Sequence, residues 1–237
     1  MQMRGLVTTA LASALWSACW AVAAGPAEFA LRWDTAQGGP TRIAEVVTAL
    51  QLQAAKGKRY EVRYFDVVQA LPVPAGYQVL GRERGAPGSK PDATYKVRGP
   101  EPMPPELLTW KCPLTGPSES KREVDVGFVG LAQVKRSFSV SCTVDKARLK
   151  ASLPAGNSAT PRGCTSAMER TKASSSTLDV KVEQWSLPQG RVVIEVSMEG
   201  SDSKVDLERF RDKVVMPLLD RKAIPLEGSK TELGSDC

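Results

Sequence analysis

Charged side chains recur at every second position along several β-rich segments of this 237-residue chain. Because the side chains of a β-strand point alternately to its two faces, residues two positions apart share a face. A face that mixes cations with carboxylates could hold a polyanion through its guanidinium and ammonium groups, and a hard divalent ion through its carboxylates. The recurring cations include Arg32, Arg82, Arg84, Lys96, Arg98 and Lys181, and the recurring carboxylates include Glu28, Glu123, Asp125 and Glu195.

Composition narrows this chemistry further. The chain has no histidine, which excludes histidine-ligated zinc, a Ser-His-Asp triad and a histidine general base. The chain is 42% hydrophobic and 24% charged, close to the average of globular proteins, so it can bury a core. The net charge of +6 is mild and forms no clear basic stripe, so we expect no nucleic-acid partner.

The charged positions fall on eight expected strands, and a helix follows the first and the last of them. The strands are expected at residues 27–34, 60–68, 77–84, 93–98, 121–128, 134–144, 178–187 and 191–199. Apolar residues at helical spacing predict helices over residues 41–54 and about 205–218, the second kinked or ended by Pro217. Residues 100–119 are expected to form a long connection, and residues 145–176 a loop with at most one short helix.

Two arrangements of these strands fit the alternation of charge. In an open antiparallel sheet, the charged face would lie in solvent and the apolar face would cover a core. In a closed barrel, the charged face would instead line the interior, where cations and carboxylates share one concave space. The shared alternation of so many strands raises the second possibility.

The N-terminus has the layout of a secretory signal peptide. A short start containing Arg4 precedes an uncharged stretch over residues 6–24, which ends in small residues before Gly25. We therefore expect cleavage after Ala24, a single domain over residues 25–237, and an exported protein, periplasmic or secreted, with no stable membrane span. Lipid anchoring at Cys19 is disfavoured because bulky Trp16 stands just before it.

Four cysteines would remain after cleavage, namely Cys112, Cys142, Cys164 and Cys237. An even number outside the cytosol favours two disulfides, with three possible pairings. The absence of a C-x-x-C spacing disfavours a zinc site. Cys142 lies on the apolar side of its expected strand, and we expect it to be oxidised.

The order of charged pairs along the chain resembles the CYTH superfamily, also called triphosphate tunnel metalloenzymes. The matching pieces are residues 28–32, 64–66, 82–84, 94–98, 123–125 and 195–197. The resemblance spans roughly residues 27–222. It implies an α+β fold in which an antiparallel eight-stranded β-barrel forms a tunnel with a charged lumen and a few flanking helices.

The resemblance also implies roles for the charged residues. Glu28, Glu123, Asp125 and Glu195 would hold Mg²⁺ or Mn²⁺. Arg32, Arg82, Arg84, Lys96 and Arg98 would clamp a triphosphate or polyphosphate, and Lys181 would neutralise the charge that develops during catalysis. The chain departs from the family where Ala30 and Ser197 replace carboxylates, and where Arg32 replaces a lysine. These departures put metal binding in doubt.

Three functions therefore remain open from the sequence. The first is a divalent-metal-dependent triphosphatase acting on tripolyphosphate or inorganic polyphosphate, since ATP is scarce outside the cytosol. The second is a module that binds a phosphorylated or other polyanionic ligand without turnover. The third is a secreted β domain stapled by disulfides, with charged faces that are only solvated.

Overall fold

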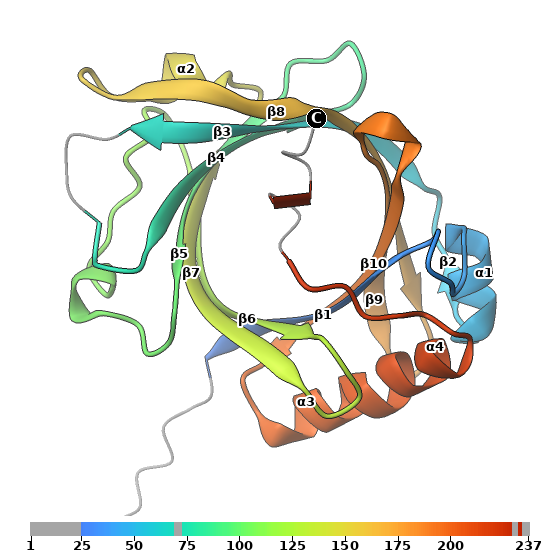
Figure 1. Cartoon of the computed structure of the whole chain (residues 1–237). Helices are drawn as coiled ribbons and strands as arrows, with labels where there is room; N and C mark the ends of the chain where they lie inside the picture. The colour runs from blue at the N-terminus through green and yellow to red at the C-terminus, as the bar shows by residue number, and fades with distance from the viewer. Residues whose placement is uncertain (1–24, 69–72, 229–231, 234–237) are drawn as a thin grey trace, which may run out of the picture.

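The computed structural model describes residues 25–68, 73–228 and 232–233, and most of these residues lie in β-strands (Figure 1). The expected signal peptide, residues 1–24, lies outside the described residues. The strands are β1 (Pro26–Asp34), β2 (Gln53–Ala54), β3 (Lys58–Val68), β4 (Gln78–Gly85), β5 (Asp92–Gly99), β6 (Glu119–Phe128), β7 (Val134–Val144), β8 (Ser158–Ser174), β9 (Asp179–Ser186) and β10 (Val192–Ser201). The α-helices are α1 (Ile43–Ala49), α2 (Leu149–Ser152), α3 (Lys204–Phe210) and α4 (Met216–Asp220). No helix of the described chain is long and apolar enough to cross a membrane.

Nine of the strands close into a barrel, which confirms the predicted tunnel. The order is β8-β3-β4-β5-β7-β6-β1-β10-β9, and β8 closes the ring because it pairs with both β3 and β9. The short β2 adds only to the end of β8. The expected eight antiparallel strands need two corrections. The barrel has a ninth strand, and β1 runs parallel to β6, a direction that alternation of side chains does not encode.

The ninth strand is β8, in the region where a loop was expected. That expectation was wrong because much of β8 is polar and exposed, so its composition is typical of a loop. Its first half pairs with β3 alone, up to Val68 opposite Ser158, and only its second half pairs with β9 as well. The short helix expected in this region is α2.

Helices α1, α3 and α4 cover the outer face of β1, β9 and β10 and form the larger core. Outward-facing Phe29 of β1 packs on Phe210 of α3, with ring centroids 6.1 Å apart. The C-terminal helix expected near residues 205–218 is present as α3 and α4, which a π-helical segment, Arg211–Val215, joins. Pro217 does not end the helix: it lies in the first turn of α4, directly after the π-helical segment. Because the helical run continues through Val215, the missing N–H of Pro217 interrupts the hydrogen-bond ladder there, which is a usual cause of a local irregularity such as this π-helical segment.

A second outer core lies under the connection between β5 and β6. A disulfide joins Cys112 of this connection to Cys142 of β7, which is buried, so the prediction that Cys142 is oxidised is confirmed. Trp110 stacks on Tyr95 of β5 in the same core. Cys164 is also disulfide-bonded, and Cys19 and Cys237 lie outside the described residues.

A third apolar cluster lies inside the barrel, where the C-terminal segment enters it. The cluster comprises Val62, Tyr64, Met168, Trp185, Leu187 and Val193, with Leu226 and Leu233 packed against it. The backbone N–H of Leu226 donates a hydrogen bond to the carbonyl of Arg32. Figure 1 shows the C-terminal segment crossing the barrel opening after α4. Leu226 and Leu233 thus cover part of the lumen wall, which no pattern in the sequence indicated.

Candidate functional site

The lumen contains a charged cavity of about 560 Å³. Eight cationic side chains line it: Arg32, Arg82, Arg84, Lys96, Arg98, Lys121, Arg170 and Lys181. Five acidic side chains line it as well: Glu28, Glu119, Glu123, Asp125 and Glu199. The barrel therefore brings nine of the ten candidate residues from the sequence to one cavity. The tenth, Glu195, lies beside Arg32 on the neighbouring strand, forms a salt bridge with it and is almost fully buried.

Three carboxylates gather where β1 meets β6. Each of Glu28, Glu123 and Asp125 offers an oxygen within 4.8 Å of the others. The parallel pairing of the two strands causes this, because it places Glu28 directly opposite Asp125. Three hard oxygen donors at this spacing fit an ion such as Mg²⁺ or Mn²⁺. Glu195 does not join this group.

The chain's own cations already neutralise these carboxylates. Lys96 Nζ lies 3.3 Å from Asp125 and 3.8 Å from Glu123, and Arg98 Nη2 lies 2.9 Å from Asp125. Burial favours the neutral form of Asp125, but Lys96 and Arg98 outweigh it and hold the pKa of Asp125 below its usual value. The pKa of Glu123 is raised instead, by its burial and by the nearby charges of Glu28 and Asp125, against the opposing effect of Lys96. Lys121 Nζ also lies 2.6 Å from Glu123, so a metal ion here would have to compete with three built-in cations.

The two positions at which the resemblance would place carboxylates, Ala30 and Ser197, are neighbours in the wall. Ala30 of β1 pairs with Ser197 of β10, and both are buried. The next pair along is Arg32 opposite Glu195, and these side chains form a salt bridge. Burial alone would lower the pKa of Arg32, but the Glu195 charge raises it. Arg32 Nη1 also donates to the carbonyl of Gly228, 2.9 Å away, so the C-terminal segment touches a residue of the cavity.

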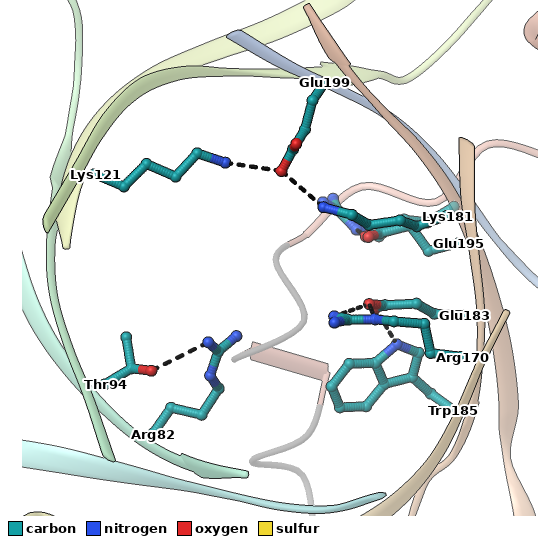
Figure 2. A network of polar contacts seen from close by, with 10 residues as sticks. Arg82, Thr94, Lys121, Arg170, Lys181, Glu183, Trp185, Glu195 and Glu199 are labelled. Atoms are coloured by element: carbon teal, nitrogen blue, oxygen red, sulfur yellow. Dashed lines mark hydrogen bonds and ion pairs between the residues drawn. The ribbon is translucent and has the colours of Figure 1, made fainter. Parts of the chain in front are cut away.

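Lys181, the candidate for neutralising charge, shares a carboxylate with a second lysine (Figure 2). Its Nζ lies 2.7 Å from Glu199, and Lys121 Nζ lies 3.1 Å from the same oxygen. The hydrogen bond from Lys181, with further help from Lys121, lowers the pKa of Glu199 to about 2. Glu199 and Lys121 are about half exposed, so this bridge lies where the cavity opens to solvent.

Three arginines, Arg82, Arg84 and Arg170, occupy another part of the lumen, and two of them lie over the ring of Tyr60. The guanidinium carbons of Arg84 and Arg170 lie 5.4 Å and 5.8 Å from the centre of the Tyr60 ring. Arg82 donates to Thr94 at 3.2 Å. Burial and the like charges of Arg82 and Arg170 lower the pKa of Arg84 to about 10. Figure 2 shows Arg82 and Arg170 reaching into the lumen from facing walls.

Sequence reasoning missed Arg170 because it lies in β8, which was taken for a loop. It is fixed by Glu183 of the neighbouring strand, which accepts hydrogen bonds from two nitrogens of its guanidinium. The other oxygen of Glu183 accepts a bond of 3.0 Å from the indole Nε1 of Trp185. The signal that could have identified Arg170 is its spacing from Lys172, two positions away on the same face, which resembles that of Arg82 and Arg84.

Comparisons with known proteins identify no family for this chain. No family model matches the sequence, and no curated protein matches it. Among solved structures, the PH1012 protein from Pyrococcus horikoshii OT3 is similar at 11% identity, over 87% of this chain and 98% of that chain, with a TM-score of 0.48. A protein from Vibrio parahaemolyticus described as a "putative adenylate cyclase" has the same identity and TM-score over 88% and 98% of the two chains. Likenesses this distant identify neither a ligand nor a reaction.

Proposed function

We propose that this protein binds a polyanionic phosphate compound inside the barrel. The observation that carries the proposal is the excess of cationic over acidic side chains in the cavity. In addition, two of the arginines have N–H groups that make no hydrogen bond to the described residues. The Nε atoms of Arg82 and Arg84 are buried, and neither has a hydrogen-bond partner among the described residues. A buried donor without an acceptor is costly, and a phosphate oxygen would satisfy it.

The resemblance to the CYTH superfamily supports the same ligand class. The residues to which the resemblance gives roles lie on β1, β4, β5, β6, β9 and β10, and all of them except Glu195 line the cavity. Arg32, Lys96 and Arg98 would hold the ligand together with Arg82 and Arg84. Guanidinium groups suit this role because their donor forks match the oxygen spacing of phosphate.

Hydrolysis of tripolyphosphate or inorganic polyphosphate is a second candidate, which the grouping of Glu28, Glu123 and Asp125 favours. These carboxylates would hold Mg²⁺ or Mn²⁺. When bound, the ion would supply Lewis-acid activation of a phosphoryl oxygen or of a water molecule. The arginines would hold the polyphosphate chain in place, and Lys181 would stabilise negative charge on the departing oxygen. Water would add to the terminal phosphorus while its bond to the bridging oxygen breaks, which releases inorganic phosphate.

The cellular setting of this proposal is the space outside the cytosol. The signal-peptide pattern of residues 1–24 and the Cys112–Cys142 disulfide support export, because disulfides persist in oxidising compartments. The proposed ligand is therefore tripolyphosphate or a related polyanion rather than ATP.

The test is calorimetric titration of the purified protein with tripolyphosphate, with and without Mg²⁺ or Mn²⁺, while released phosphate is measured. Micromolar binding supports the proposal. Metal-dependent release of phosphate, abolished by Glu28→Gln, would identify the enzyme, whereas binding without release would identify a receptor. Absence of any binding would refute both and leave a β domain whose charged faces are only solvated.

A further inference from the structure

The pairing of Cys164 determines how one end of the barrel is closed. Three of the five cysteines lie among the described residues, and all three are disulfide-bonded. Cys112 and Cys142 pair with each other, so the partner of Cys164 within the chain is Cys19 or Cys237. We infer that Cys164 pairs with Cys237, and that this second disulfide fastens the C-terminal segment across one end of the barrel. The inference goes beyond the proposed function, because it holds for any ligand of the lumen.

The strand register places Cys164 near the end of the barrel that the C-terminal segment crosses. Ala167 of β8 pairs with Ser186, the last residue of β9. That end of β9 pairs with the start of β10, which lies beside the end of β1. The C-terminal segment reaches the same place, because Pro225 forms an isolated bridge with Trp33 of β1. Cys164 and the described part of the C-terminal segment therefore lie at one end of the barrel.

The C-terminal segment also comes within reach of β8 itself. Glu232 lines the same cavity as Arg162, which precedes Cys164 by two positions. Leu233 packs against the apolar cluster to which β8 contributes. Cys237 follows Leu233 by four residues, and four residues span at most about 14 Å. The chain is therefore long enough to bring the two cysteines to disulfide distance.

Cys19 is the weaker candidate for two reasons. It precedes Ala24, after which the sequence predicts cleavage, so the exported protein would not contain it. Gly25, which precedes β1, lies at the opposite end of this strand from the C-terminal segment. Its carbonyl accepts a hydrogen bond from the N–H of Asp202, just beyond the end of β10.

A disulfide at this place would anchor the C-terminal segment at both of its ends. Helix α4 holds one end. Between the two anchors, Leu226 donates its N–H to the carbonyl of Arg32, and the Arg32 guanidinium donates to the carbonyl of Gly228. Two anchors leave the segment few open conformations, because the entropy gained on opening falls when the free chain is short. A ligand would then enter at the other end, beside Lys121 and Glu199, and a linear polymer could insert one end but could not pass through the barrel.

The bond would form by thiol–disulfide exchange. The thiolate of one cysteine attacks a disulfide donor, such as an oxidised thiol oxidoreductase outside the cytosol, and forms a mixed disulfide. The thiolate of the other cysteine attacks this mixed disulfide and releases the donor. Both protein thiols lose their protons, and the donor disulfide takes up the two electrons and leaves as two thiols.

The first experiment maps the disulfides of the purified wild-type protein, kept without reductant. After free thiols are alkylated and the protein is digested with trypsin, mass spectrometry should find residues 163–170 linked to residues 231–237. An alkylated Cys164, or its linkage to Cys19 or to a second molecule, would overturn the pairing. Because the map uses the wild type, it does not depend on the folding of any variant.

The second experiment tests the fastening by hydrogen exchange. In Cys164→Ser/Cys237→Ser, the amide of Leu226 should exchange at least tenfold faster than in the wild type, while amides of α3 exchange at the wild-type rate. Cys112→Ala/Cys142→Ala is the matched control: it removes the other disulfide and should leave exchange at Leu226 within about twofold of the wild type. Circular dichroism checks that each variant is folded.

The outcomes are independent of the proposed function. Unchanged exchange at Leu226 in the serine variant would overturn the fastening, even where the linked peptides are found. Faster exchange in the serine variant alone, together with the linked peptides, supports the inference. A wild type that binds no tripolyphosphate would refute the proposed function and leave both of these results as they are.

Discussion

Restoring one missing carboxylate should strengthen metal binding, and Ala30→Glu is the substitution that does so. Ala30 lies between Glu28 and Arg32 on the lumen face of β1. Its position is 5% exposed, yet it borders a cavity of about 250 Å³ that also touches Asp125. A glutamate side chain therefore has space to extend towards the carboxylate group of Glu28, Glu123 and Asp125.

The expected gain follows from the charges involved. A carboxylate about 5 Å from a divalent ion gains about 6–7 kcal/mol at an effective dielectric constant of about 20. Most of this is offset, because desolvating the new carboxylate costs several kcal/mol and Arg32 competes with the ion for it. A net gain of about 1.4–2.8 kcal/mol corresponds to a 10- to 100-fold lower Kd for Mn²⁺.

The assay is calorimetric titration of Mn²⁺ into the wild type, Ala30→Glu and Ala30→Gln. The glutamine variant fills the same space without the charge and should bind Mn²⁺ no more tightly than the wild type. Equal Mn²⁺ affinity in the glutamate and glutamine variants would show that the ion does not bind near β1, and would refute the reasoning.

Three further predictions follow from the described contacts. Replacing Cys112 and Cys142 together by alanine should lower the free energy of unfolding by about 3–4 kcal/mol, because the disulfide closes a loop across 30 residues of sequence separation; unchanged urea unfolding would contradict this. Sulfate affinity should rise as the pH falls from 7 to 5, because the raised pKa of Glu123 lets it lose its charge while the absence of histidine removes the usual group that titrates there. An identical pH slope in Glu123→Gln would show that another group titrates. Leu226→Ala should lower the free energy of unfolding by about 1–2 kcal/mol, whereas Ile224→Ala, at an exposed position, should lower it by less than about 0.5 kcal/mol. Equal losses in urea unfolding would mean that the C-terminal segment does not pack in the lumen.

Much of the barrel could be predicted because most of its strands, though not β8, carry charged side chains on the lumen face and apolar side chains on the outer face. In β1, Phe29 and Leu31 face the outer core, while Glu28 and Arg32 face the lumen, and this contrast is visible in the sequence. The same rule placed Cys142 on an apolar face, where it is buried. Its partner, Cys112, was one of the pairings that the sequence left open.

The remainder depended on pairings between distant segments. Alternation shows which face a side chain occupies, but strand direction and neighbours are long-range properties, so the parallel contact of β1 with β6 could not be predicted. The polar first half of β8 hid a strand, and with it Arg170. The entry of Leu226 into the lumen depends on where α4 ends, and a short polar C-terminal sequence gives no sign of it.

The carboxylates and the arginines lie in different parts of the lumen. The absence of carboxylates at Ala30 and Ser197 therefore affects these two parts differently. Ala30 and Ser197 face each other across β1 and β10, and a carboxylate at either position would have added to the part of the cavity where a metal ion would bind. Arg84 and Arg170 lie on β4 and β8, and their surroundings contain no substituted position of this kind. Weakened metal binding would therefore leave these two cavity-lining arginines unchanged. This arrangement of carboxylates and arginines in separate parts of the lumen favours binding without turnover. Measuring how ligand binding and phosphate release each depend on the metal ion tests this directly.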